Sequence, residues 1–212
     1  MAEPKDQAIP YQSNQPARVN VIGTGISAVN MVQTLDSIER VIVGGGPGFV
    51  CCAAVHSVLD AHRDPGLREA FNRSLLTTPD GMPLVWLCRM TGIRSTKRVY
   101  GPDLMRAACA FGERRGWKHF FLGGSPPTLQ ALSHALQATH PGIKIVGCLS
   151  PAYPDPSIAQ IDRQVVEVIN GTEPDIVWVG LGTGKQERWM ARHLGAVEAP
   201  LMIGVGAAFD FL

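Results

Sequence analysis

The sequence predicts an α/β protein, a single Rossmann-like α/β/α sandwich around a mostly parallel sheet. Short apolar runs of strand length alternate with longer segments of helical periodicity, which is the pattern of strand–helix–strand units. Several of these runs end in glycine-rich loops, and parallel sheets bind ligands beyond the ends of their strands. No repeat, low-complexity segment or linker divides the chain. We therefore expect one domain over residues 18–212, preceded by a disordered leader over residues 1–17.

The first half of the chain contains three expected strands and four expected helices. The strands are Arg18–Gly23, Arg40–Gly45 and residues 75–79. Periodicity and apolar content predict helices over residues 28–38, 50–61, 66–74 and 82–90, of which the second and the last are expected to be buried.

The second half shows clearer helix boundaries. Pro102 and Asp103 suit the first turn of a helix over residues 101–116. Ser125 is the expected N-cap of the next helix, whose apolar stripe is Leu129, Leu132 and Leu136. The helix over residues 157–171 has a possible capping box, Ser157 with Gln160, and a stripe of Ile158, Ile161, Val165 and Val168. A last helix is expected over residues 185–195, and strands over residues 119–124, 143–148, 175–180 and 201–206.

Composition excludes several classes of function. The chain has 19 basic and 18 acidic residues, so its net charge of +1 predicts no nucleic-acid partner. Its five cysteines are odd in number and lack C-x-x-C spacing, which indicates a reducing compartment without disulfides or a zinc site. The first residues lack the apolar core of a secretory signal, and no apolar run approaches the roughly 20 residues that span a bilayer. These features predict a cytoplasmic protein, at most peripheral to a membrane.

Three glycine-bearing loops follow expected strands and should meet at one edge of the sheet. They hold Gly123 and Gly124, then "GLGTGKQE" from Gly180 to Glu187, and finally Gly206 and Asp210. The amides that start the helix after the second loop favour an anion. Lys185 stands there against the helix dipole, which suggests that it faces a phosphate; alternatively, Glu187 satisfies the dipole and Lys185 is solvated.

Asp80 is a lone carboxylate between two apolar runs, in "LLTTPDGMPLVWL". Asp-Gly is also a common turn, so the local sequence leaves a catalytic and a structural role open. His56, in an apolar run, is by default a core histidine and otherwise a substrate contact. Arg98, in "KRVYGPDLM", could meet a diphosphate or be solvated.

Two glycine motifs suggest other ligands. "GTGISA", Gly23 to Ala28, fits the G-x-G-x-x-A dinucleotide fingerprint, but the acid expected after the next strand is absent, which argues against NAD. "GGGPG", Gly44 to Gly48, lacks the Lys-Ser/Thr of a P-loop and is more simply a flexible loop.

Five ordered blocks resemble the WecG/TagA/CpsF glycosyltransferase family. They are "RDPGLREAFNRSLLTTPDGMPLVW", "RVYGPDLM", "FFLGGSP", "VGLGTGKQERWM" and "IGVGAAFDFL", within a resemblance from about Val19 to Leu212. The resemblance implies an inverting, metal-independent transfer of a sugar from a UDP-sugar to a polyprenyl-diphosphate-linked glycan in cell-surface polysaccharide synthesis. It implies no cofactor and no metal ligands, and a homo-oligomer on the inner face of the membrane.

The resemblance also implies roles for single residues. Asp80 falls on the proposed general base of the family's "PDG" block, and Gln186 falls on a donor-site glutamine of its "KQE" block. We expect donor binding from a set of loop residues and substrate contacts from four others: Gly123, Gly124, Gly182, Lys185, Gln186, Glu187 and Gly206 for the donor, and His56, Arg98, Asp103 and Asp210 for the substrate.

The sequence departs from the family in two places. Cys52 stands about where many relatives carry a donor-site threonine, which leaves His56 as a polar replacement. Relatives usually continue past "FDFL" with a basic, amphipathic tail that helps to bind the membrane and supplies arginines to the active site. We therefore expect weak or absent activity from this chain alone, unless another subunit completes the site. The alternatives are a non-catalytic nucleotide-sugar-binding protein on the same fold and, on "GTGISA" alone, an NAD-dependent oxidoreductase.

Overall fold

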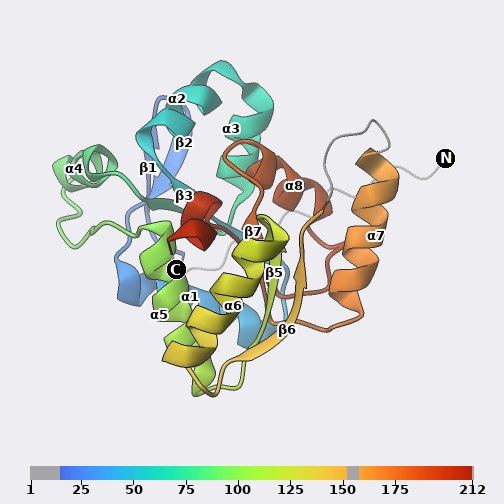
Figure 1. Ribbon diagram of the computed structural model, residues 1–212. Coiled ribbons are helices and arrows are strands. Elements are labelled where there is room, and N and C mark those ends of the chain that lie inside the picture. Colours follow the sequence, from blue (N-terminus) through green and yellow to red (C-terminus); the bar gives the residue numbers. More distant parts are fainter. Residues whose placement is uncertain (1–14, 152–157, 212) are drawn as a thin grey trace.

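A computed structural model describes residues 15–151 and 158–211 and confirms the α/β architecture (Figure 1). Six parallel strands form the central sheet in the order β4-β3-β8-β7-β5-β6. Their bounds are Gly48–Ala53 for β3, Leu76–Pro79 for β4, Lys118–Gly123 for β5, Lys144–Leu149 for β6, Ile176–Gly180 for β7 and Leu201–Gly204 for β8. The predicted leader lies, for residues 1–14, outside the described residues.

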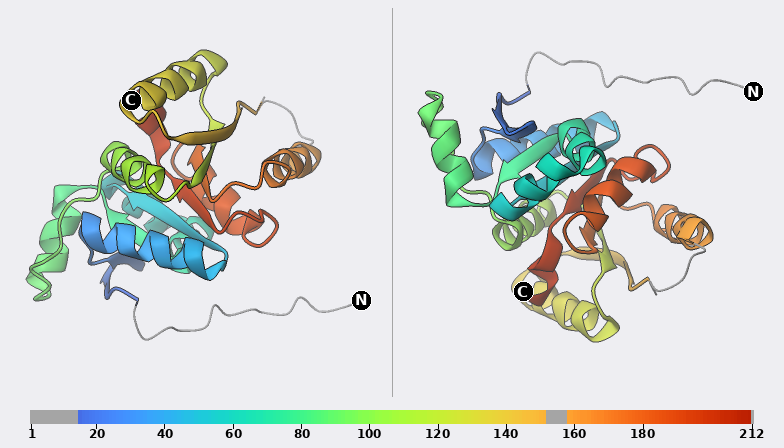
Figure 2. Two further views of the ribbon diagram at one scale, coloured as in Figure 1. Left: turned by 90° about the horizontal axis from the view of Figure 1, so that it is seen from below. Right: turned by 90° about the horizontal axis from the view of Figure 1, so that it is seen from above.

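Helices cover both faces of this sheet (Figure 2). Side chains alternate between the faces along each strand; in β7, for example, Val177 and Val179 pack on one face and Trp178 on the other. One face carries α1 (Met31–Gly44), α5 (Gly101–Glu113), α6 (Pro126–Thr139) and η1 (Gly206–Asp210). The other carries α2 (Val55–Arg63), α3 (Pro65–Arg73), α4 (Met82–Met90), α7 (Ile158–Asn170) and α8 (Lys185–His193).

Side-chain caps begin three helices. Asn30 and Gln33 form a capping box at the start of α1. Ser125 caps α6 as predicted, and its stripe of Leu129, Leu132 and Leu136 is buried. Asp64 caps α3 by accepting a 2.9 Å hydrogen bond from the Leu67 amide.

The predicted strand Arg40–Gly45 is wrong, because these residues complete α1. Ile38, Val41 and Ile42 continue the helical stripe that packs on the sheet, and this packing outweighs the strand preference of β-branched residues. Gly45 then ends the helix in the left-handed conformation, with φ of 64°.

The predicted helix over residues 50–61 is also wrong in its first half. Residues 50–53 belong to β3, and α2 begins only at Val55. Because β3 is buried on both faces, its sequence is continuously apolar and its periodicity cannot distinguish strand from helix.

The glycine motifs lie in other contexts than their fingerprints require. Gly23 is in the turn of an antiparallel hairpin, β1 (Arg18–Val21) with β2 (Thr24–Ser27), so the strand-to-helix turn of a dinucleotide site is absent from "GTGISA". "GGGPG" connects α1 to the start of β3, at the edge of the sheet opposite the carboxyl ends of the strands.

Two burial expectations need correction. In α7 the side chain of Val168 is exposed, and Ile169 packs inside instead. Helix α4 was expected to be buried, yet only one of its sides is. The proposed capping box at Ser157 lies outside the described residues.

Candidate active site

The carboxyl ends of the six strands lie at one edge of the sheet, here called the carboxyl edge. Most predicted site residues lie in the loops and helix starts that follow the strands at this edge. Asp80 comes directly after β4, and His56 is the second residue of α2, three residues beyond the end of β3. Gly123 ends β5 and Gly124 follows it; the loop with Gly182 follows β7, and Gly206 follows β8. The topology therefore brings together residues far apart in the sequence.

Asp80 is held in place by its main chain and by Arg98. Its amide donates to Ala53 O at 3.0 Å, which ties the ends of β3 and β4 together. Arg98 Nε donates to the Asp80 carbonyl, and Arg98 Nη2 lies 3.3 Å from Asp80 Oδ1. The guanidinium also stacks on Tyr100, 4.2 Å from the ring centroid. The Asp80 side chain remains 19% exposed, so the carboxylate is fixed but reachable.

The surroundings of Asp80 suit a general base. Desolvation raises the pKa of this carboxyl above its ordinary value, although Arg98, a hydrogen bond from the Gly101 backbone and the charge of His56 counteract the rise. Asp80 and Arg98 therefore form one electrostatic cluster, and the charge of His56 acts on it. The default interpretation of His56 as a core histidine is wrong, because its side chain is exposed at the start of α2.

Gln186 and Glu187 form a second, buried cluster at the start of α8. Gln186 Nε2 donates to Glu187 Oε1 at 2.9 Å, and Gln186 Oε1 accepts from the Gly206 amide at 3.0 Å. Glu187 Oε2 accepts from the Gly184 amide at 2.6 Å. Desolvation raises the pKa of Glu187, and its hydrogen bonds counteract the rise. This cluster joins the loop after β7 to the loop after β8.

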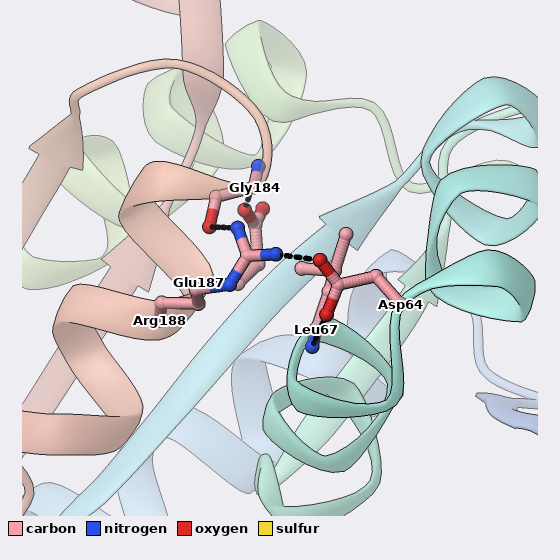
Figure 3. Close-up of polar contacts among 5 residues, drawn as sticks. All are labelled: Asp64, Leu67, Gly184, Glu187 and Arg188. Atoms are coloured by element: carbon pink, nitrogen blue, oxygen red, sulfur yellow. Dashed lines mark hydrogen bonds and ion pairs between the residues drawn. The ribbon is translucent and has the colours of Figure 1, made fainter.

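An ion pair braces the same loop from outside (Figure 3). Arg188 donates to the Gly184 carbonyl at 2.9 Å and pairs with Asp64 at the start of α3. The Leu67 amide, followed by the Arg188 charge, lowers the pKa of Asp64. The local sequence does not predict this pair: "DPG" at a helix start is an N-cap signal for Asp64, but nothing local links Asp64 to a residue 124 positions away.

Glycines allow the strand ends to approach each other closely. Gly123 has φ of 113°, and a Cβ added there would lie 2.3 Å from the Gly180 oxygen of β7. Gly124, Gly182 and Gly206 also have positive φ, but a Cβ added at Gly182 would meet open space. Gly182 is thus a place where the loop backbone is open to solvent.

Among the predicted site residues, three charged ones lie outside both clusters. Lys185 is exposed, and the structure gives it no ion pair within the described residues. Asp103 pairs with Arg106, 3.6 Å away, and Asp210 is exposed on η1. In the described part of the chain no group of three or more His, Cys, Asp or Glu side chains is arranged to hold a metal ion.

The comparison with known protein families decides the assignment, since one family model matches residues 19–212. The chain belongs to the WecG/TagA/CpsF glycosyl transferase family. The WecG/TagA/CpsF match covers both clusters described above. It also makes this chain a glycosyltransferase.

Curated relatives are consistent with that family. The N-acetylglucosaminyldiphosphoundecaprenol N-acetyl-beta-D-mannosaminyltransferases of Staphylococcus aureus strains NCTC 8325 and MRSA252 are each 25% identical over 201 residues. Each alignment covers 94% of this chain and 77% of the relative. None of the helices in the described residues is long and apolar enough to cross a bilayer.

Proposed function

We propose that this protein transfers N-acetylmannosamine from a UDP-sugar to a polyprenyl-diphosphate-linked N-acetylglucosamine, with Asp80 as the general base. The names of the relatives support this acceptor and this sugar. The observation that carries the role of Asp80 is its position: a partly exposed, desolvated carboxylate at the carboxyl edge, held by Arg98. Because the acceptor is anchored in a lipid, the reaction takes place at a membrane surface, on the cytoplasmic side that supplies UDP-sugars.

The proposed step is a single displacement with inversion at the anomeric carbon. The acceptor hydroxyl attacks the anomeric carbon while the Asp80 carboxylate takes its proton. The new glycosidic bond forms as the bond to the UDP oxygen breaks, and UDP leaves with the electron pair. Desolvation gives Asp80 the basicity that this proton transfer needs, whereas Arg98 keeps it ionised before the step.

The leaving diphosphate needs positive charge or amide donors nearby. The amides at the start of α8 and the exposed Lys185 are suitable, because the helix dipole and the ammonium both favour an anion. The open backbone at Gly182 allows a ligand to approach this loop. We propose no metal in this step.

The test is a transfer assay with UDP-N-acetylmannosamine and a short-chain, water-soluble prenyl diphosphate carrying N-acetylglucosamine. Asp80→Asn should lower kcat by about 10²–10⁴-fold without loss of UDP binding. Asp36→Asn, at an exposed position on α1, is the matched control and should leave the rate unchanged. EDTA should not alter the wild-type rate.

Each component of the proposal has an outcome that would contradict it. Full activity of Asp80→Asn would exclude Asp80 as the base. UDP binding by the wild-type chain without transfer to any acceptor would favour a non-catalytic nucleotide-sugar-binding protein. Loss of activity with EDTA, restored by a divalent cation, would contradict the metal-free step.

A further inference from the structure

Helix α4 exposes a stripe of large apolar side chains. Leu84, Val85 and Cys88 point into the core. On the other side Met82, Trp86 and Met90 are spaced four residues apart and therefore lie on one face of the helix. Trp86 is 57% exposed and Met90 is 81% exposed. This is the arrangement of an amphipathic helix whose apolar face lacks a partner within the described residues.

The segment that carries this stripe is strongly basic. Between Asp80 and Asp103 the sequence contains no acidic residue but four basic ones, Arg89, Arg94, Lys97 and Arg98, although the whole chain has a net charge of only +1. Trp86, Arg89, Met90 and Arg94 line an open hollow of about 460 Å³. Guanidinium groups and apolar side chains thus lie side by side on the surface.

We propose that α4 and the basic loop after it, residues 82–98, dock onto an anionic phospholipid bilayer. A helix of this kind lies in the interface, with its apolar face at the acyl boundary and its basic groups near the lipid phosphates. Tryptophan is favoured at that depth because one end of its ring system is apolar and the other polar. Helix α4 stands at the margin of the molecule in Figures 1 and 2, where a flat surface can reach it.

Charge favours a bilayer over a second copy of this chain. In a two-fold contact through α4, the basic segment of one copy would face the basic segment of the other, and like charges repel across an interface. An anionic bilayer instead complements both the charge and the apolar stripe.

The docking surface adjoins the proposed catalytic carboxylate. Helix α4 begins two residues after Asp80, so docking through α4 would hold the carboxyl edge near the lipid surface. This consequence for catalysis rests on the proposed function, in which the acceptor is lipid-linked. Binding to lipid vesicles does not depend on it.

Trp86 supplies its own optical signal. Of the four tryptophans, Trp117, Trp178 and Trp189 are buried, so a change of environment on binding should come from Trp86. The experiment is sedimentation and fluorescence with vesicles of phosphatidylcholine alone or with 30% phosphatidylglycerol. We expect binding and a blue shift only with the anionic vesicles, weakened by salt. Trp86→Phe should still bind but should lose the shift.

Paired variants test the two halves of the surface. Trp86→Ser with Met90→Ser should reduce vesicle affinity by roughly ten-fold or more, from the apolar area lost. Arg94→Gln with Lys97→Gln should reduce it by a similar factor and make it less sensitive to salt. The control is Val43→Ser, because Val43 is 78% exposed but lies near the end of α1 at the opposite edge of the sheet, and it should bind like wild type.

Several results would overturn the inference. Equal binding to neutral and anionic vesicles, or wild-type binding by the Trp86/Met90 variant, would do so. So would Trp86-dependent dimers without vesicle binding, which would assign the surface to a second copy. If the protein does not bind vesicles but glycosylates the soluble acceptor, only this inference is contradicted. If it binds vesicles but transfers no sugar, only the proposed function is contradicted.

Discussion

Replacing Gln186 by methionine should destabilise the fold. The family resemblance assigns this side chain to the donor site, yet in the structure its amide already makes two internal hydrogen bonds. Its oxygen accepts from the Gly206 amide at 3.0 Å, and its nitrogen donates to the Glu187 carboxylate at 2.9 Å. Both contacts are internal, and the side chain is buried. Gln186 therefore holds the loops of β7 and β8 together.

The size of the effect follows from these two bonds. A neutral hydrogen bond contributes about 1 kcal/mol to stability, and a bond to a charged group about 1.5–3 kcal/mol. Methionine fills a similar volume, so cavity formation adds little. The expected loss is about 3 kcal/mol, which for a chain of this size lowers Tm by about 6–12 °C.

Thermal unfolding followed by circular dichroism measures this loss, and calorimetric titration with UDP measures donor binding. Lys185→Met is the matched control, since the neighbouring Lys185 is exposed, and its stability should change by less than about 0.5 kcal/mol. A Tm of Gln186→Met within about 1 °C of wild type, together with weaker UDP binding, would refute the structural role.

Three further predictions concern pH and backbone geometry. Desolvation lowers the pKa of His119 to about 4. The unfolded chain therefore binds an extra proton between about pH 6.5 and 4, and this residue should remove about 3 kcal/mol of unfolding free energy as the pH falls through that window. His119→Gln should lack that loss in urea titrations; parallel pH profiles would contradict the assignment. Arg98 lowers the pKa of Asp80, so Arg98→Met should move the acidic limb of the kcat/KM pH profile to higher pH. The limb of Arg98→Lys should lie between those of wild type and Arg98→Met. An acidic limb that does not move would contradict the effect of the Asp80–Arg98 ion pair. Gly123→Ala should lower the free energy of unfolding by more than about 2 kcal/mol in denaturant titrations, because its Cβ would collide with β7. Gly182→Ala, in open space, should lower it by only about 1–2 kcal/mol. Equal losses of unfolding free energy in the two variants would show that the close approach is unimportant.

The local sequence predicted secondary structure best where a polar capping residue marks the start of an element. Ser125 and its leucine stripe marked α6 correctly. In the first half, "RVIVGG" and the run from Val50 to Ala61 misled because continuous apolar sequence fits either a buried strand or a helix. Which one forms depends on neighbours: α1 packs along the sheet through Ile38, whereas β3 pairs with β4 and β8. That information is non-local.

The site shows the same division. Asp80 was recognisable as a lone carboxylate after a strand, and Lys185 as a cation at a helix start. Arg98, the partner of Asp80, lies 18 residues from it, and Gln186 and Gly206, which are hydrogen-bonded, lie 20 residues apart. Neither pairing is therefore visible in a local window of the sequence. The exposure of α4 could not be predicted because its composition is that of a core helix; only its packing against one side of the molecule shows the difference.

Glu187 is the natural rival of Asp80 for the role of base, because desolvation raises the pKa of both carboxyls. Desolvation raises the pKa of the Cys52 thiol to about 12, and the charges of both carboxyls add to the rise. Their accessibility separates them. Glu187 is 1% exposed, and its oxygens accept from Gly184 and Gln186, so it cannot reach an acceptor hydroxyl. Asp80 keeps an open side. Glu187→Gln should therefore lower Tm while the folded fraction keeps measurable transfer, and Asp80→Asn should lose transfer at nearly unchanged Tm; the reverse pattern would make Glu187 the base.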